Sequence, residues 1–366
     1  MRMEIKSDGV RDGFSRGYSR LGTVDSDKAY DINKRRLAVC CGLELHMRIK
    51  KRNLPASAFF AIAAVVCTIY SMSADFGQPQ VSGDGRLQII ATTTMLYDLT
   101  SEIAGGSAVV TGLMGAGIDP HQYQASAGDV VKLQNADVVI YTGLHLEGRM
   151  GEVFQSLEKH GKTVVCIADS IAESKLICDD KGTYYDPHIW FDIALWKNAA
   201  HAVASALGIA DETNSATYQT NLEAYLLRLE ELEQYVLMRV GELEASRCVL
   251  ITAHDAFGYF GRAYGFEVLG LQGTNTSSEA GARDVAKLAK LIAERKINAV
   301  FLETSLPVKN IEALTTAVHS RGFEVAFGGI LYSDSLGDFN SGHETYIAAF
   351  RSNIDTIVDA LKEGAA

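Results

Sequence analysis

The chain has 366 residues, of which 47% are hydrophobic and 22% are charged, and its net charge is −11. This composition excludes a disordered chain and a single small module, and it supplies enough apolar side chains for two sizeable cores. Residues 75–366 hold 21 lysines and arginines against 38 aspartates and glutamates, which disfavours nucleic acid as a partner and favours cations.

The first 74 residues are predicted to lie outside the folded core. Residues 1–46 are polar and lack apolar periodicity, so they are interpreted as an extension before a natural start at Met47. Residues 47–74 combine a basic flank, an apolar run at 58–70 and small residues, which is typical of a secretory signal peptide and short for a membrane span of about 20 residues. We expect export to the periplasm or cell surface. An uncleaved anchor and lipidation of Cys67 are the alternatives to cleavage.

Three cysteines follow the signal segment, namely Cys166, Cys178 and Cys248. An odd number without a CxxC pair indicates neither a disulfide framework nor a thiolate zinc site.

From Leu87 onward, short β-branched runs alternate with amphipathic segments. The predicted strands are Leu87–Ala91, Ala108–Met114, Asp137–Tyr141 and Thr163–Ile167. The predicted helices lie near Met95–Ala104, Gly128–Ala136 and Met150–His160. This alternation predicts an α/β lobe with a mostly parallel sheet flanked by helices.

A helix near Ile193–Leu207 precedes a long segment, residues 214–243, that has no proline and only Gly241 as glycine. Its apolar residues recur at steps of three and four, with charged residues between them. This pattern predicts one long helix of about 45 Å. We interpret it as a rigid strut between two lobes rather than as a coiled coil.

A second α/β series follows the strut. Its predicted strands are Cys248–Thr252, Glu267–Leu271, Ala299–Leu302 and Glu324–Phe327, and its predicted helices lie near Ala256–Tyr264, Ala282–Arg295, Lys309–Arg321 and His343–Leu361. The expected domains are therefore an N-terminal lobe at 75–211, a linking helix at 212–244 and a C-terminal lobe at 245–366.

Three histidines and a carboxylate follow the apolar runs. His121 and His188 each stand in an Asp-Pro-His motif, and His254 and Asp334 follow runs of the second series. Their separations of 67, 66 and 80 residues are far larger than the ligand spacing of zinc fingers, so the fold has to assemble any shared site. Because parallel strands present their carboxyl ends to ligand crevices, we expect these four residues to share a metal ion, with two ligands from each lobe.

Neighbouring residues are candidates for orienting these ligands. The proline before His121 and before His188 stiffens each loop, and Asp119, Asp186 and Glu303 could accept hydrogen bonds around the site. Five further histidines after residue 74 lack such a setting and are expected at the surface or on helices: His145, His160, His201, His319 and His343.

Each candidate also has a plain structural interpretation, because a histidine at a strand end or an aspartate in a turn often only satisfies hydrogen bonds. Other kinds of site have less support. The loop Gly112–Gly117 lacks the order of a dinucleotide or phosphate loop, and neither GxSxG nor HExxH occurs. Two metal-based alternatives stay open: a zinc hydrolase with Glu303 as general base, and a structural zinc that locks two lobes.

Five ordered motifs carry a family resemblance, and they are Gly115–His121, Asn135–Asp137, Asp186–Asp192, Thr252–Phe260 and Tyr332–Gly337. From about Leu87 to the C-terminus, the chain resembles the TroA-like family of zinc- and manganese-binding proteins of ABC importers.

The resemblance implies two α/β lobes joined by a rigid helix, one transition-metal ion in the cleft, and delivery of that ion to a membrane permease without catalysis or an organic cofactor. Carried over by motif, the ligands are His121, His188, His254 and Asp334. The third ligand is histidine here, whereas several manganese-type relatives have glutamate there. Residues 170–186 lack the histidine-rich loop of many zinc-specific members, so both zinc and manganese stay open as cargo.

Overall fold

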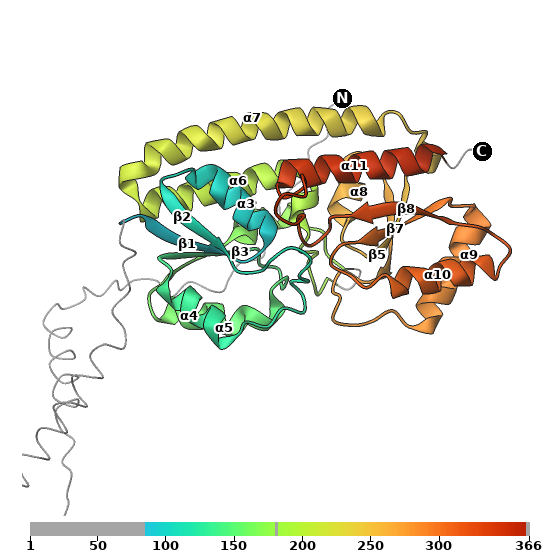
Figure 1. Cartoon of the computed structure of the whole chain (residues 1–366), viewed down its shortest axis with the longest axis horizontal. Coiled ribbons are helices and arrows are strands. Elements are labelled where there is room, and N and C mark those ends of the chain that lie inside the picture. Colours follow the sequence, from blue (N-terminus) through green and yellow to red (C-terminus); the bar gives the residue numbers. More distant parts are fainter. Residues whose placement is uncertain (1–84, 180–181, 364–366) are drawn as a thin grey trace, which may run out of the picture. The chain divides into compact units, whose positions relative to one another are not determined.

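The computed structural model describes residues 85–179 and 182–363, which fall within one compact unit, Pro79–Ala366. The predicted extension, the signal peptide and Cys67 lie outside the described residues. The described chain forms two α/β lobes with a long helix along both (Figure 1), which confirms the predicted fold class. The domain boundaries expected near residues 211 and 244 stay a prediction.

The first lobe is built on a four-stranded parallel sheet with the strand order β2-β1-β3-β4. Its strands are β1 (Leu87–Ala91), β2 (Ala108–Gly112), β3 (Val138–Tyr141) and β4 (Thr163–Cys166). Its helices are α3 (Thr94–Ala104), α4 (Ala127–Asn135) and α5 (Gly151–Lys159), with the short 3-10 turns η1 (Gly148–Met150), η2 (Ile167–Ser170), η3 (Glu173–Lys175) and η4 (Ile189–Phe191).

The alternation of side chains along β1 and β3 explains why both faces of this sheet are covered. Ile89 and Val138 join the large core on the side of α3, whereas Ile90 and Val139 join a smaller core with Leu133 of α4 and residues of α5. Because neighbouring residues of a strand point to opposite faces, a continuous apolar run predicts a buried central strand.

The helix α7 (Ser215–Val240) spans 26 residues, which corresponds to about 39 Å at 1.5 Å per residue. It follows α6 (Ile193–Ala210) and η5 (Glu212–Asn214), ends at Gly241, and precedes η6 (Ala245–Arg247). It packs against α6, α3 and α11, so it contacts helices of both lobes (Figure 1). The predicted long helix is confirmed, slightly shorter than expected.

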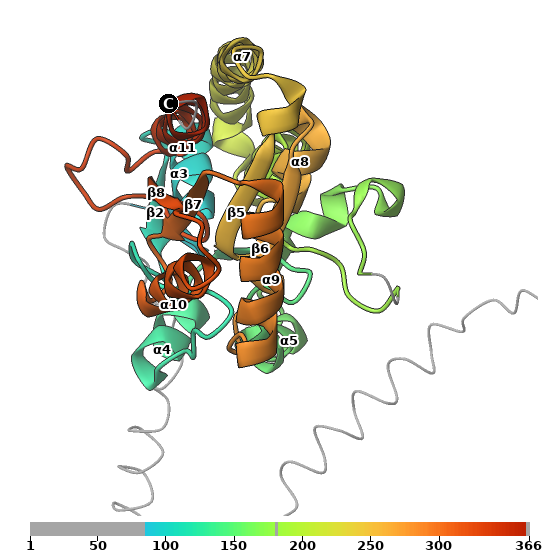
Figure 2. The ribbon, with the colours of Figure 1, turned by 90° about the vertical axis from the view of Figure 1, so that its right-hand side faces the viewer.

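The second lobe contains two parallel strand pairs, β5-β6 and β7-β8, with β5 beside β7. Its strands are β5 (Val249–His254), β6 (Glu267–Gln272), β7 (Ala299–Glu303) and β8 (Ala326–Leu331). Its helices are α8 (Gly258–Tyr264), α9 (Ala282–Arg295), α10 (Lys309–His319) and α11 (Tyr346–Glu363). Helices α9 and α10 lie side by side on this lobe, away from α7 (Figure 2).

The position of β8 differs from the predicted strand at 324–327. The strand runs through Gly328 and Gly329 to Leu331, with a register irregularity opposite Val300 and Phe301. A Cβ on Gly328 would lie 2.5 Å from the ring of Phe301, and Gly329 has φ 137°, so both positions require glycine. In the sequence, the glycine pair interrupts the apolar pattern, although the strand continues through it.

The two lobes share their largest hydrophobic core. The rings of Phe191 and Phe257 have centroids 4.2 Å apart, and Trp196 stacks on Tyr346 at 5.1 Å. Beside them, Asp98 of α3 accepts a 2.9 Å hydrogen bond from the first amide of α11. Opening the lobes widely would expose this core to water, so the fold resists a large hinge motion.

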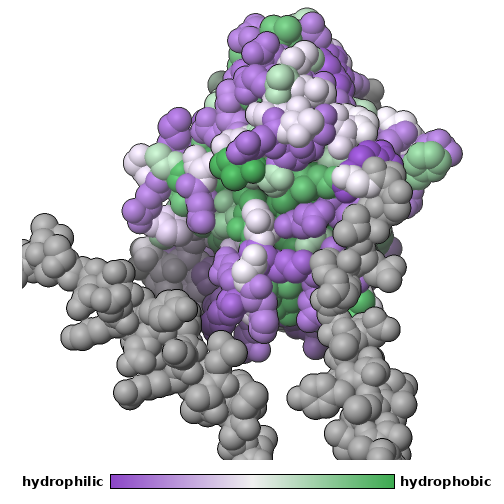
Figure 3. Space-filling model, turned by 90° about the vertical axis from the view of Figure 1, so that its left-hand side faces the viewer, coloured by the Kyte–Doolittle hydropathy of each residue, from purple (hydrophilic) through white to green (hydrophobic). Residues whose placement is uncertain are grey.

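One face of the molecule is mostly polar. Figure 3 shows hydrophilic residues with smaller hydrophobic areas between them on the face at the end of the first lobe. Within residues 85–179 and 182–363, no helix combines the length and apolar character needed to cross a bilayer.

Candidate metal site

Four side chains from distant parts of the chain meet between the lobes. His121 lies in the loop after β2, and His188 directly precedes η4. His254 is the last residue of β5, and Asp334 lies three residues beyond β8. One ligand atom from each lies within 4.8 Å of those of all the others. The four residues that the sequence singled out are therefore neighbours in the fold.

The spacing of these atoms fits a small tetrahedral ion. The Nε2 atom of His188 lies 3.3 Å from Nε2 of His121 and 3.3 Å from Nε2 of His254. The oxygens of Asp334 lie 3.8, 3.3 and 3.2 Å from the Nε2 atoms of the three histidines in chain order. Ligands at the usual zinc distance of about 2.05 Å stand about 3.3 Å apart in a tetrahedron. The arrangement can therefore hold zinc without large movements.

The burial of the four side chains also fits a metal site. Exposure is 3% for His121, 0% for His188 and His254, and 1% for Asp334. Neither carboxylate oxygen of Asp334 makes a hydrogen bond within the described part of the chain. A buried carboxylate facing three imidazole nitrogens is costly unless a cation or protons compensate it.

Two of the imidazoles are braced by carboxylates at their second ring nitrogen. Nδ1 of His188 lies 2.6 Å from Asp186, and Nδ1 of His254 lies 2.6 Å from Glu303. Each carboxylate also accepts the backbone N–H of the same histidine, at 2.9 and 2.8 Å. This pairing fixes the ring orientation and leaves Nε2 free to bind a metal, as expected of metal-binding histidines. Glu303 thus contacts His254 where the sequence predicted an orienting carboxylate, and its role toward a metal stays a prediction.

The third imidazole is held differently. Asp119 accepts the backbone N–H of His121 at 2.9 Å but makes no bond to its ring. Among the described residues, Nδ1 of His121 has no hydrogen-bond partner, and unlike Nδ1 of His254, which also lacks hydrogen-bond geometry, it has no carboxylate at 2.6 Å. Pro120 between them is buried and fixes φ, so the position of this ring depends on the position of its loop.

The same contacts set the protonation of the groups. Burial lowers the pKa of His121 to about 4, despite the nearby Asp334. Burial also disfavours charge on His188, but Asp186 and Asp334 outweigh it and raise its pKa to about 9. Glu303 and Asp334 likewise raise the pKa of His254 well above its usual value. In return, His254 and His188 hold the pKa of the buried Asp334 well below its usual range.

The remaining candidates fall outside the cluster. His145, His160, His201 and His319 are exposed and His343 is half-buried, as expected. Two residues near the site were not among the candidate site residues, although Ser335 lies within the motif Tyr332–Gly337. Thr276 donates to Asp119 at 2.6 Å, and Ser335 accepts the amide of Gly117 at 2.9 Å. Both lie in the second lobe and contact the first-lobe loop that carries His121, and no local pattern marks Thr276.

Known proteins match this chain over nearly all of its described residues. Residues 89–360 match the family described as zinc-uptake complex component A, periplasmic. The zinc-binding protein TroA of Treponema pallidum is 46% identical over 286 residues, which cover 78% of this chain and 92% of that protein. The manganese-binding lipoprotein MntA of Bacillus subtilis is 42% identical over 281 residues, which cover 77% and 92%.

A solved structure has the same architecture. The periplasmic zinc-binding protein TroA from Treponema pallidum superposes with a TM-score of 0.74 at 46% identity, covering 76% of this chain and 99% of that one. The agreement extends over nearly all of the described residues and includes both lobes.

Proposed function

Since the chain belongs to the zinc-uptake complex component A family of periplasmic proteins, we propose that it is an extracytoplasmic solute-binding protein that captures Zn(II) or Mn(II) and delivers the ion to an ABC-type importer. One observation carries the proposal: three imidazole nitrogens and a carboxylate converge within 4.8 Å in a buried position between the lobes. The proposed ligands are His121, His188, His254 and Asp334.

The donor set supports a borderline transition-metal ion as cargo. Imidazole suits zinc and other late transition metals, whereas magnesium and calcium prefer oxygen ligands throughout. Relatives named for zinc and for manganese are similar to this chain to almost the same degree. Overall similarity therefore does not choose between these two ions, and the choice depends on the site.

Binding without catalysis is the better account of the site. A catalytic zinc keeps an open position for water, usually beside three protein ligands, whereas here four ligand groups converge. Glu303, the general base of the hydrolase alternative, already contacts the ring and the amide of His254. Removing it from these contacts would leave the imidazole without its brace.

A purely structural zinc is also less well supported. Such a metal would be needed to hold the lobes together, but the lobes already share a large core and the helix α7. We therefore expect the metal-free protein to stay folded, as a carrier has to do when it has released its cargo. We also propose that residues 47–74 act as the signal peptide for export. The alternative to cleavage is a lipid anchor at Cys67.

The test is zinc titration of the protein after removal of metal by chelation. Wild type should bind one zinc per chain, and alanine at each proposed ligand should lower the affinity by about 10²- to 10³-fold, because four ligands share a binding free energy of about 10–16 kcal/mol. His201→Ala, which removes an exposed histidine on α6, is the matched control. Circular dichroism checks that the fold survives. Full zinc affinity in all four alanine variants would show that the assignment is wrong.

A further inference from the structure

The loop after β6 begins beside the proposed ligand His254 and extends toward the first lobe. It begins after Gln272, which is the register partner of His254, and it reaches Gly281 at the start of α9. Residues 273–281 are exposed or half-buried except Thr276, whose exposure is 3%. A single buried residue in an otherwise exposed loop indicates a specific contact.

That contact crosses to the first lobe. The hydroxyl of Thr276 donates to Oδ2 of Asp119 at 2.6 Å, and the side-chain amide of Gln122 donates to the same oxygen at 3.0 Å. The other oxygen of Asp119 accepts the backbone N–H of His121. One carboxylate therefore connects a hydroxyl of the second lobe to the backbone of a metal ligand in the first lobe. Hydrogen bonds to a charged acceptor are stronger than neutral ones.

The position of the His121 ring depends on this connection, because the ring itself is held by fewer contacts than the rings of His188 and His254. Nδ1 of His121 has no hydrogen-bond partner among the described residues. Nδ1 of His254 also lacks hydrogen-bond geometry, but it lies 2.6 Å from Glu303, and Nδ1 of His188 lies 2.6 Å from Asp186. Two further hydrogen bonds join the His121 loop to the second lobe. The side-chain amide of Gln122 donates to the carbonyl of Thr276 at 3.5 Å, and the amide of Gly117 donates to Ser335 at 2.9 Å. Moving the loop away would withdraw Nε2 of His121 and leave the other ligands in place.

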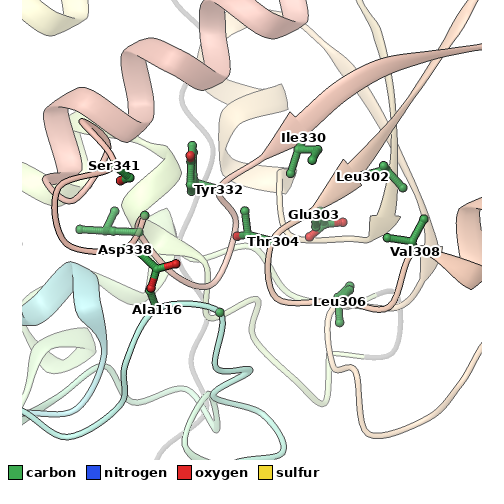
Figure 4. A pocket seen from close by; sticks show the side chains of 13 residues that line it. Ala116, Leu302, Glu303, Thr304, Leu306, Val308, Ile330, Tyr332, Asp338 and Ser341 are labelled. Carbon is green, nitrogen blue, oxygen red and sulfur yellow. The ribbon is translucent and has the colours of Figure 1, made fainter.

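Both loops border open space. A cavity of about 400 Å³ has Ala116 in its wall, facing Glu303 and Tyr332 of the second lobe (Figure 4). A second cavity of about 520 Å³ lies beside the loop at 273–281, with Ser278 in its wall. Because neither loop is tightly packed on these sides, local separation needs no opening of the shared core. A local movement of these loops would therefore open the site without separating the lobes.

We propose that Thr276 is a positioning residue that latches the His121 loop to the second lobe, and that breaking its hydrogen bond to Asp119 is the step that releases the bound metal. The inference rests on the proposed function, since it concerns release from the same four ligands. It adds a residue that acts through Asp119 and touches no metal ligand side chain. A threonine that only stabilised the fold would affect unfolding and not the rate of metal release.

The experiment measures zinc release from the full-length protein into excess chelator by stopped flow. Thr276→Val keeps the shape of the side chain and removes the hydroxyl, and it should raise the release rate about tenfold, as expected for loss of a hydrogen bond to a charged group. Thr276→Ser keeps the hydroxyl and should release zinc at the wild-type rate. Ser277→Ala, at an exposed position of the same loop, is the control and should change nothing.

A second comparison separates a latch from general loosening. In an Asp119→Ala background, Thr276→Val should add no further acceleration, because its acceptor is already missing. The unfolding temperature of the metal-free variants should fall by only a few degrees, as expected for the loss of one hydrogen bond from the native state. Equal release rates for wild type and Thr276→Val would overturn the latch, as would a serine variant as fast as the valine variant. A wild type that binds no stoichiometric zinc would instead overturn the proposed function.

Discussion

The histidines of the site are held in two different ways. His188 and His254 each contact a carboxylate through both the ring and the backbone N–H, and neither is exposed to solvent. His121 lies in a loop, its second ring nitrogen has neither a hydrogen-bond partner nor a close carboxylate within the described chain, and Asp119 contacts only its backbone.

This difference divides the site into a fixed part, His188 and His254, and a movable part, His121 with its loop. The carboxylates beside Nδ1 already orient the rings of His188 and His254 with Nε2 toward the site. Metal binding therefore loses no further side-chain entropy in ordering these two rings. A carrier must also release its ion, and a ligand on a loop that is held by few hydrogen bonds can move without disturbing the core. The comparison leads to four predictions, ordered from the largest expected effect to the smallest.

The affinity for zinc should fall steeply as the pH falls, because protons compete with the metal for imidazole nitrogens. The pKa of His188 is raised to about 9 and that of His254 lies well above 6.5, so both carry protons at pH 7 that metal has to displace. The pKa of His121, lowered to about 4, adds no proton above pH 5. Between pH 7 and 5 we expect a loss of about 10²- to 10⁴-fold, since one or two protons compete.

Competition with a chelator of known proton linkage measures this dependence. Affinity should still increase above pH 7, as His188 loses its proton. Three equivalent rings would instead give a steeper fall that begins near pH 6.5. An affinity that does not change between pH 5 and 7 would contradict a site built from histidines.

Removal of a brace should weaken binding more than removal of the carboxylate near His121. Glu303→Gln should lower zinc affinity about 10- to 100-fold, because the amide cannot replace the charge beside the ring of His254. Asp119→Asn should cost less than about tenfold, because Asp119 contacts no imidazole. Glu294→Gln, at an exposed position on α9, is the control. Equal losses for the first two variants would remove the distinction between fixed and movable ligands.

Zinc should bind more tightly than manganese, by at least about tenfold, because Mn²⁺ stands lowest in the Irving–Williams order at nitrogen and oxygen sites. Manganese could gain from extra oxygen ligands, but the oxygens nearest the fixed rings already serve as braces. Competitive titration of metal-free protein measures the ratio. If manganese displaced zinc at equal free concentration, further oxygen donors would have to enter from the movable side, or Glu303 would have to leave His254.

The smallest effect on metal binding is expected at Asp98, where the lobes meet away from the metal. Burial raises its pKa to about 7, so stability that is fully present below pH 4 is lost as the pH rises through 7. Asp98→Asn keeps an acceptor for the amide of Tyr346 without the charge. Relative to wild type, it should gain up to about 4 kcal/mol of stability between pH 4 and 8, and its zinc release should be unchanged.

Urea unfolding of the metal-free proteins at several pH values measures the first part, and stopped-flow release measures the second. A variant that loses stability with pH as wild type does would show that Asp98 ionises freely in the folded state. Faster zinc release would show that the contact between the lobes also controls the metal.

Much of the fold follows from local patterns in the sequence. The strand Leu87–Ala91 and the helix Ala282–Arg295 have the expected bounds, because an apolar run or an amphipathic period is written in consecutive residues. Boundaries shifted where glycine interrupts the pattern, as at Gly328 and Gly329 in β8. Whether a strand passes through glycine depends on the side chain opposite, here Phe301, which the local sequence does not show.

The site divides in the same way. The sequence by itself marked His121, His188, His254 and Asp334, because each follows an apolar run and parallel strands bring their carboxyl ends together. It also pointed to Asp186 and Glu303, which lie beside a ligand motif or a strand end. Only the tertiary structure decided which carboxylate braces which ring, and that His121 has no brace.

Thr276 shows most clearly what cannot be predicted from the local sequence. It lies 157 residues from Asp119, in a loop without periodicity, and it carries a common side chain. Its contact exists because two lobes bring two loops together, so it depends on the packing of the whole chain. Repeating patterns encode elements and the direction of their ends, whereas a single hydrogen bond between distant loops depends on geometry that arises only when the chain has folded.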